Sequence, residues 1–304
     1  MSAIQAAFFT FLQAGDHVIS SRSLFGTTVG FINNIVTKFG IEVSHVSPTD
    51  MDEWKAAVKA NTKLLFLETP SNPLGEVADL EALAELAHSI GALLVVDNSL
   101  LSPVGSQPLK HGADISVSSA TKAIDGHGRV MGGVLAGSEE LMMQVAMYCN
   151  SCGLAMSPFN AWQLLSGVET LSLRLEKQFD NALKIAQWLR TQPQVQAVYY
   201  TGLPDHPQAE LIRKQQNGGG IVIGFEVADQ EAAWKVVDSV ELFSRTANLG
   251  DVRSTITHPW TTTHGRMQPE EKLAANIRPG LVRLSVGLEY VDDLIDDLKQ
   301  ALAR

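Results

Sequence analysis

The sequence predicts an α/β protein: a mostly parallel sheet flanked by helices, followed by a smaller C-terminal α+β domain. Short apolar runs alternate with longer amphipathic segments through the first half, which is the pattern of βαβ units. In the second half, strand and helix signals recur in mixed order. The 304 residues suggest two domains, at ~150 residues per domain. We therefore expect a first domain over residues 1–178 and a C-terminal domain over residues 179–304.

Five strands are expected in the first half, each a short apolar run that ends in polar or glycine-rich residues. They lie at residues 17–20, 64–67, 93–96, 115–118 and 132–136. Residues 79–90 place leucine and alanine at helical spacing, with Asp79 as the N-cap and Gly91 as the stop. The chain starts abruptly, because residues 4–9 already resemble a helix without a cap, as in the middle of a domain.

The second half opens with a long helical pattern over residues 159–191, which contains no proline and is closed by Pro193. We expect this helix to carry the chain from one domain into the next. Beyond it, strands are expected at residues 195–200, 221–227 and 281–286, and helices at residues 230–240 and 291–303.

The composition excludes several classes of protein. Lys and Arg number 23 against 33 Asp and Glu, a net charge of −10, so an acidic surface argues against nucleic-acid binding, which depends on neutralising phosphates. No apolar run reaches the ~18 residues of a membrane span, and no signal peptide is expected. Two cysteines make no disulfide framework, and a cytoplasmic location is expected. Their lone CxxC spacing (Cys149, Cys152) has no second pair to complete a zinc site.

Polar side chains follow three neighbouring predicted strands. Asn72 lies in the proline-rich loop after residues 64–67, Asp97 directly follows residues 93–96, and Lys122 comes shortly after residues 115–118. Ligands of open parallel sheets bind at the carboxyl ends of the strands, so these side chains should face one crevice. Taken singly, each residue has an ordinary reading, as a turn residue or a solvated surface charge.

Together these side chains match the chemical needs of pyridoxal phosphate. Its aldehyde requires an amine that forms a Schiff base, and its pyridinium nitrogen requires an anion. Its phosphate requires hydroxyls and backbone N–H donors, and its phenolic oxygen requires a donor such as an amide. The strand ends supply an amine, a carboxylate, an amide and, at Ser119 and Thr121, two hydroxyls.

Five sequence blocks in order resemble the cystathionine γ-synthase family of pyridoxal-phosphate enzymes. They are ETPSNP, LLVVDNS, GADISVSSATK, SPFNAWQLLSGVETL and LVRLSVGLE, and the match runs from Met1 almost to Arg304. The resemblance implies a transferase of fold type I that assembles as a homotetramer, a dimer of dimers. It also implies a small-molecule substrate and no nucleic-acid, membrane or metal partner.

The resemblance implies a role for each polar residue at the strand ends. Lys122 resembles the lysine that carries the cofactor, and Asp97 resembles the partner of the pyridinium nitrogen. Ser119 and Thr121 resemble the phosphate ligands, and Asn72 the residue beside the ring hydroxyl.

Further roles follow from the resemblance outside these strand ends. Arg283, with Ser254, resembles the clamp on the substrate α-carboxylate, which suits the planar fork of arginine. Phe25 stands where family members carry a tyrosine that stacks on the cofactor, so the ring is kept and the hydroxyl is lost. Met1 resembles the methionine of a turn that binds phosphate, and the N-terminal arm of the family is expected to be missing.

Two blocks, SLFGTT at residues 23–28 and TTTHGR at residues 261–266, resemble the O-succinylhomoserine sulfhydrylase branch of the family. This branch implies a γ-replacement that forms homocysteine from O-succinylhomoserine and sulfide, in methionine biosynthesis. Three alternatives stay open: cysteine as the thiol, as in cystathionine γ-synthase; the O-acetyl ester as the substrate; and a truncated, catalytically inactive remnant.

Overall fold

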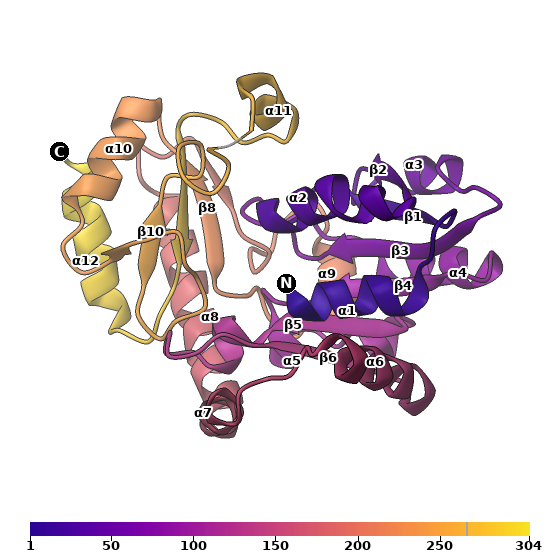
Figure 1. The fold of residues 1–304 in the computed structure, drawn as a ribbon. Helices are drawn as coiled ribbons and strands as arrows, with labels where there is room; N and C mark the ends of the chain where they lie inside the picture. Colours follow the sequence, from indigo (N-terminus) through magenta and orange to yellow (C-terminus); the bar gives the residue numbers. More distant parts are fainter. Residues whose placement is uncertain (266) are drawn as a thin grey trace.

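Two sheets, one from each half of the chain, form the framework of the protein (Figure 1). The computed structural model describes residues 1–265 and 267–304. The first sheet has six strands in the order β2-β1-β3-β4-β5-β6, and the second has five in the order β7-β8-β11-β10-β9. The expected α/β first half and α+β second half are therefore confirmed.

The first sheet is mostly parallel, as expected. Its strands are β1 (His17–Ser21), β2 (Glu42–Val46), β3 (Thr62–Glu68), β4 (Leu93–Asp97), β5 (Ile115–Ser119) and β6 (Gly133–Gly137). The first five run parallel, and β6 pairs antiparallel with β5. Sequence analysis did not predict β2, because its residues EVSHV are largely polar and lie at an exposed edge of the sheet.

Both faces of this sheet are covered by helices. They are α1 (Ser2–Phe11), α2 (Gly26–Asn34), α3 (Met51–Ala56), α4 (Leu80–Ser89), α5 (Ser102–Gly105) and α6 (Glu139–Cys152), with the short turns η1 (Val36–Phe39) and η2 (Pro108–His111). Phe66 of β3 packs with Phe8 of α1 on one face, whereas Leu65 packs with Leu83 of α4 on the other. Alternating side chains of one buried strand thus join two cores. The Asp79 cap of α4 is confirmed by the bond that its side chain accepts from the backbone N–H of Ala82.

The long helix expected at residues 159–191 is two helices, α7 (Pro158–Glu169) and α8 (Leu171–Leu189). The break lies at Thr170, whose φ of −112° and ψ of 8° leave the helical region. The Thr170 hydroxyl accepts a bond from Arg174 Nε, and the same guanidinium reaches the carbonyl of Gly167 across the break. These hydrogen bonds to Arg174 favour a break in the helix at Thr170. The spacing of apolar residues in the sequence does not reveal that break.

The second sheet carries the C-terminal half. Its strands are β7 (Ala197–Tyr199), β8 (Val222–Glu226), β9 (Ser244–Arg245), β10 (Thr255–Thr257) and β11 (Leu281–Ser285), and its helices are α9 (Ala209–Gln215), α10 (Gln230–Ser239), α11 (Pro269–Ala274) and α12 (Val291–Leu302). Its pairs are antiparallel except β9 with β10. Phe225, Leu284 and Leu298 share its core, which α10 and α12 cover.

Helix α8 belongs to both halves. Leu175 packs against the turn that follows β5, whereas Ile185 lies in the core of the second sheet. The domain boundary expected at residue 178 falls within this helix and stays a prediction. Of the helices in the described ranges, none combines the length and the apolar character that crossing a membrane requires.

Candidate active site

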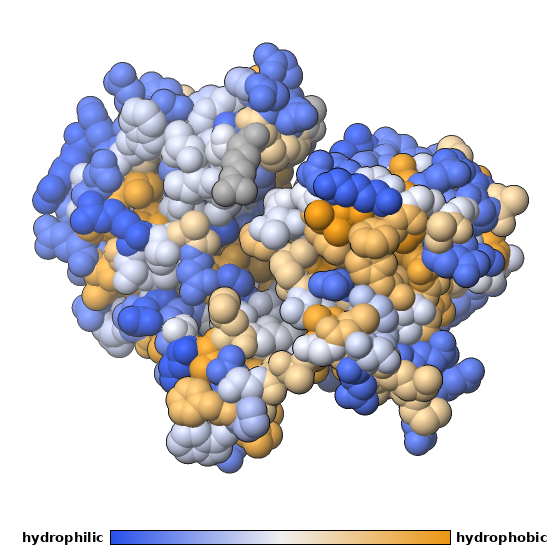
Figure 2. Space-filling view, in the orientation of Figure 1, coloured by the Kyte–Doolittle hydropathy of each residue, from blue (hydrophilic) through white to orange (hydrophobic). Residues whose placement is uncertain are grey.

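A pocket opens between the two halves, at the edge where β3, β4 and β5 end. Figure 2 shows a hollow between the halves, with apolar side chains gathered around α1 beside it. The pocket is lined by seven of the residues singled out from the sequence: Met1, Phe25, Asn72, Asp97, Ser119, Lys122 and Arg283. Residues far apart in the chain therefore converge, as expected for neighbouring ends of parallel strands.

Asp97 ends β4 and is only 7% exposed. One carboxylate oxygen, Oδ1, accepts bonds from the backbone N of Ser99 at 3.0 Å and from its hydroxyl at 2.5 Å. The Ser99 hydroxyl in turn accepts a bond from the backbone N of Ser119 at 2.7 Å, which ties the ends of β4 and β5 together. Burial raises the pKa of Asp97, and the bonds from Ser99 oppose that rise. Asp97 also lines the pocket, and its second oxygen, Oδ2, accepts no hydrogen bond from the described residues.

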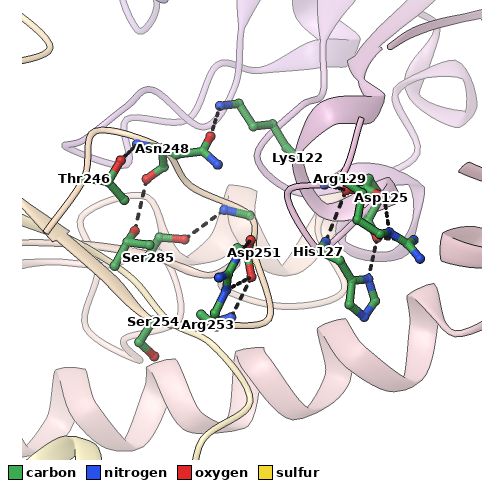
Figure 3. A network of polar contacts seen from close by, with 12 residues as sticks. Lys122, Asp125, His127, Arg129, Thr246, Asn248, Asp251, Arg253, Ser254 and Ser285 are labelled. Atoms are coloured by element: carbon green, nitrogen blue, oxygen red, sulfur yellow. Dashed lines mark hydrogen bonds and ion pairs between the residues drawn. The ribbon is translucent and has the colours of Figure 1, made fainter. Parts of the chain in front are cut away.

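Lys122 lies in the wide helical turn η3 (Ala120–Ile124) that follows β5. Its Nζ donates to Oδ1 of Asn248 at 2.7 Å, as Figure 3 shows. Burial and the positive charge of Arg283 lower the pKa of the Lys122 amine. A lysine with a lowered pKa is more often in the neutral form that attacks carbonyl groups.

The backbone around Lys122 is held from two sides. The buried guanidinium of Arg174 donates to the carbonyl of Ala123 at 2.8 Å. From the second half, Gly250 approaches so closely that a Cβ on it would lie 2.9 Å from the Lys122 Cα. Gly250 also has a φ of +84°, so both the space and the backbone conformation require glycine here.

Arg283 lies on β11 and is only 2% exposed. Its Nη2 donates to the carbonyl of Ala247 at 2.7 Å, and its Nη1 makes a long 3.4 Å bond to Asn72. Its Nε has no hydrogen-bond partner among the described residues. Burial alone lowers the pKa of Arg283 to about 10, with no acidic group of the described chain to offset it. A buried guanidinium of this kind favours an anionic ligand.

Two predicted site residues do not line the pocket. The Thr121 hydroxyl is bonded to the backbone of Gly132, and Ser254 is buried beside β10, where its hydroxyl donates to Glu289 at 2.8 Å. A residue of the same loop that was not expected at the site, Asn248, accepts a bond from Lys122 Nζ. Of the block at residues 261–266, Arg266 lies outside the described residues.

Glu68, Ser99 and Asn248 were not expected at this site from the sequence, although Glu68 and Ser99 line the pocket and Asn248 contacts Lys122. Ser99 follows Asp97 by two positions, a spacing at which a hydroxyl commonly bonds an aspartate, so a local signal was present. Asn248 lies in an irregular loop and contacts a lysine 126 positions away, so no local pattern marks it.

The donor set in the pocket fits pyridoxal phosphate. It offers a half-buried amine, a buried carboxylate with one free oxygen, an amide at Asn72 and the Ser119 hydroxyl. These are the groups that the aldehyde, ring nitrogen, phenolic oxygen and phosphate of this cofactor require.

Comparisons with known proteins agree with this chemistry. Residues 1–303 match the family described as Cys/Met metabolism PLP-dependent enzyme. The chain is 49% identical to the O-succinylhomoserine sulfhydrylase of Pseudomonas aeruginosa, over all of this chain and 75% of that protein. It is 41% identical to an L-methionine gamma-lyase of Fusobacterium nucleatum subsp. polymorphum, over all of this chain and 78% of that protein.

A solved structure is similar over nearly the whole chain. The cystathionine gamma-lyase from Lactobacillus plantarum, complexed with L-serine, superimposes with a TM-score of 0.95 at 34% identity, covering 99% of this chain and 79% of that one. The fold, the family match and the donor set of the pocket agree, and the chain belongs to the Cys/Met metabolism family of pyridoxal-phosphate-dependent enzymes.

Proposed function

We propose that the protein catalyses a γ-replacement in methionine biosynthesis, in which O-succinylhomoserine and sulfide give homocysteine and succinate. The Cγ–O bond of the substrate breaks, a Cγ–S bond forms, and succinate leaves. The observation that carries the proposal is the presence, in one pocket, of the Lys122 amine and the buried Arg283 guanidinium, which has no acidic partner among the described residues. Such a pair suits an amino-acid substrate, and the 49% identity to an O-succinylhomoserine sulfhydrylase supports the acyl group and the thiol.

The residues of the pocket divide the work between binding and proton transfer. When bound, pyridoxal phosphate supplies an electron sink for the negative charge that develops at the substrate Cα. Asp97 keeps a proton on the ring nitrogen, while Ser99 holds the carboxylate in place. Arg283 binds the α-carboxylate through its fork, and Ser119 binds the phosphate. Asn72 contacts the phenolic oxygen.

Lys122 is the proposed base. Its amine would hold the cofactor and would remove the proton from the substrate Cα. Its lowered pKa favours the neutral form that this step needs, and Asn248 accepts a bond from Nζ and so orients it. Because Phe25 has no hydroxyl, Lys122 also carries the proton at Cβ in this proposal.

An activity panel tests the proposal against its alternatives. The purified chain with pyridoxal phosphate should form homocysteine from O-succinylhomoserine only when sulfide is present. A faster reaction with cysteine or with the O-acetyl ester would replace the proposed substrates, and methanethiol release from methionine would identify a lyase instead. Cofactor binding without turnover of any substrate would support an inactive remnant.

The assembly and location are part of the same proposal. We infer a homotetramer, which the family resemblance supports. We also infer a cytoplasmic location, which the two free cysteines, Cys149 and Cys152, support. Light scattering coupled to size-exclusion chromatography measures the mass in solution, and a monomeric mass of 32.9 kDa would contradict the tetramer.

A further inference from the structure

Two buried carboxyl groups line the pocket from neighbouring strands. Glu68 ends β3, Asp97 ends β4, and the two residues are paired in register. Neighbouring strands lie about 4.8 Å apart, and paired residues point to the same face. Both side chains are buried, at 5% and 7% exposure, and both line the pocket. The proposed mechanism uses Asp97 and leaves Glu68 without a role.

The two carboxyl groups are held differently. Asp97 accepts two bonds from Ser99, whereas Glu68 accepts one, from the backbone N of Phe25 at 2.8 Å. Two adjacent buried carboxylates do not both ionise readily, so the better-bonded group keeps the charge. Burial and the charge of Asp97 raise the pKa of Glu68 to about 8. Of the two carboxyl groups, Glu68 is therefore the one that favours the neutral form.

The hydrogen bond that Glu68 accepts comes from a segment that lines the pocket. Phe25 is the N-cap residue of α2, and it makes no side-chain cap bond. Its side chain lines the pocket and is 49% exposed. Because the Phe25 side chain is half exposed, its position depends on the position of its backbone. The hydrogen bond to Glu68 fixes that backbone at the end of β3.

We propose that Glu68, as a neutral acid, is a positioning residue that holds the backbone of Phe25 at the sheet edge, so that the Phe25 ring closes on the cofactor. The neutral form also leaves Asp97 as the single anion facing the ring nitrogen. This inference rests on the proposed function only through the contact of Phe25 with the cofactor.

Three single variants test the inference with the purified protein and added pyridoxal phosphate. Glu68→Ala removes the acceptor, Glu68→Gln keeps a neutral acceptor of the same length, and Glu226→Ala is the matched control. Glu226 is also a buried glutamate at a strand end, 4% exposed, but it bonds Tyr199 in the second sheet. The readouts are the visible circular dichroism of the bound cofactor and its dissociation constant by equilibrium dialysis.

We expect Glu68→Ala to raise the cofactor dissociation constant by about two- to tenfold, the range for one lost hydrogen bond, and to weaken the dichroic band. Glu68→Gln should stay within about twofold of the wild type. Glu226→Ala should leave both cofactor signals unchanged. Should Glu68→Ala fail to fold, Glu68→Asp, which is one methylene too short, takes its place with the same expected result. An effect of Glu68→Gln as large as that of Glu68→Ala would overturn the neutral-acid role.

A double-mutant cycle with Phe25→Ala shows whether Glu68 acts through Phe25. Adding Glu68→Ala to Phe25→Ala should change the cofactor signals little further. Fully additive effects would overturn the inference, as would a wild-type signal in Glu68→Ala alongside an altered Phe25→Ala. A wild-type signal in Phe25→Ala would also overturn the inference, because it would contradict the contact between the Phe25 ring and the cofactor that the family resemblance implies.

Discussion

Replacing Arg283 isolates the binding of the substrate carboxylate from the binding of the cofactor. Two donors of the guanidinium lack a good partner among the described residues, because Nε has none there and Nη1 makes only a 3.4 Å bond. Each charge-assisted hydrogen bond contributes about 1.5–3 kcal/mol. Losing two such bonds in Arg283→Ala costs at least about 3 kcal/mol, or roughly two orders of magnitude in kcat/KM. Arg283→Lys keeps a charge but not the fork, and should lose roughly tenfold to a hundredfold.

The assay compares two substrates that differ only in the carboxylate. Steady-state kinetics with O-succinylhomoserine and with its α-carboxamide should show a strong preference for the acid in the wild type. That preference should collapse in Arg283→Ala, while the absorbance of the bound cofactor stays unchanged. An unchanged kcat/KM in Arg283→Ala, or an undiminished preference for the acid, would refute the reasoning from the unpaired guanidinium.

Three further predictions concern the cofactor end of the pocket. Lys122→Ala should abolish covalent attachment, so that borohydride reduction traps no adduct; an adduct mapped to another lysine would end the assignment. Asp97→Asn should lower turnover by roughly two to three and a half orders of magnitude, since breaking a buried ion pair costs about 3–5 kcal/mol; near-normal rates would contradict its role. Gly250→Ala should destabilise the fold by about 2 kcal/mol or more and weaken cofactor binding, as measured by urea unfolding and dialysis. Gly153→Ala is its control, because Gly153 has a φ of +69° but open space around it; equal losses in both variants would refute the close approach to Lys122.

The sequence by itself determined the buried parallel strands of the first half and the polar residues that gather at their ends. Buried parallel strands read as continuous apolar runs, so β3, β4 and β5 are visible without tertiary information. The carboxyl ends of such strands meet at one edge, which places Asn72, Asp97 and Lys122 together for a physical reason. The edge strand β2 is largely exposed and has no apolar run, so the sequence pattern did not predict it.

Only the tertiary structure decided what the second half brings to the pocket. Asn248 and Gly250 meet Lys122 from an irregular loop, and no spacing within that loop specifies a contact more than 120 positions away. The resemblance suggested Ser254 beside Arg283 in the clamp on the substrate α-carboxylate, but the Ser254 hydroxyl donates to Glu289 beside β10 and does not line the pocket. The pairing of Glu68 with Asp97 likewise depends on the register between two strands. Local patterns specify local backbone structure, whereas the packing of distant segments decides which buried polar groups face one another and which of them carries a charge.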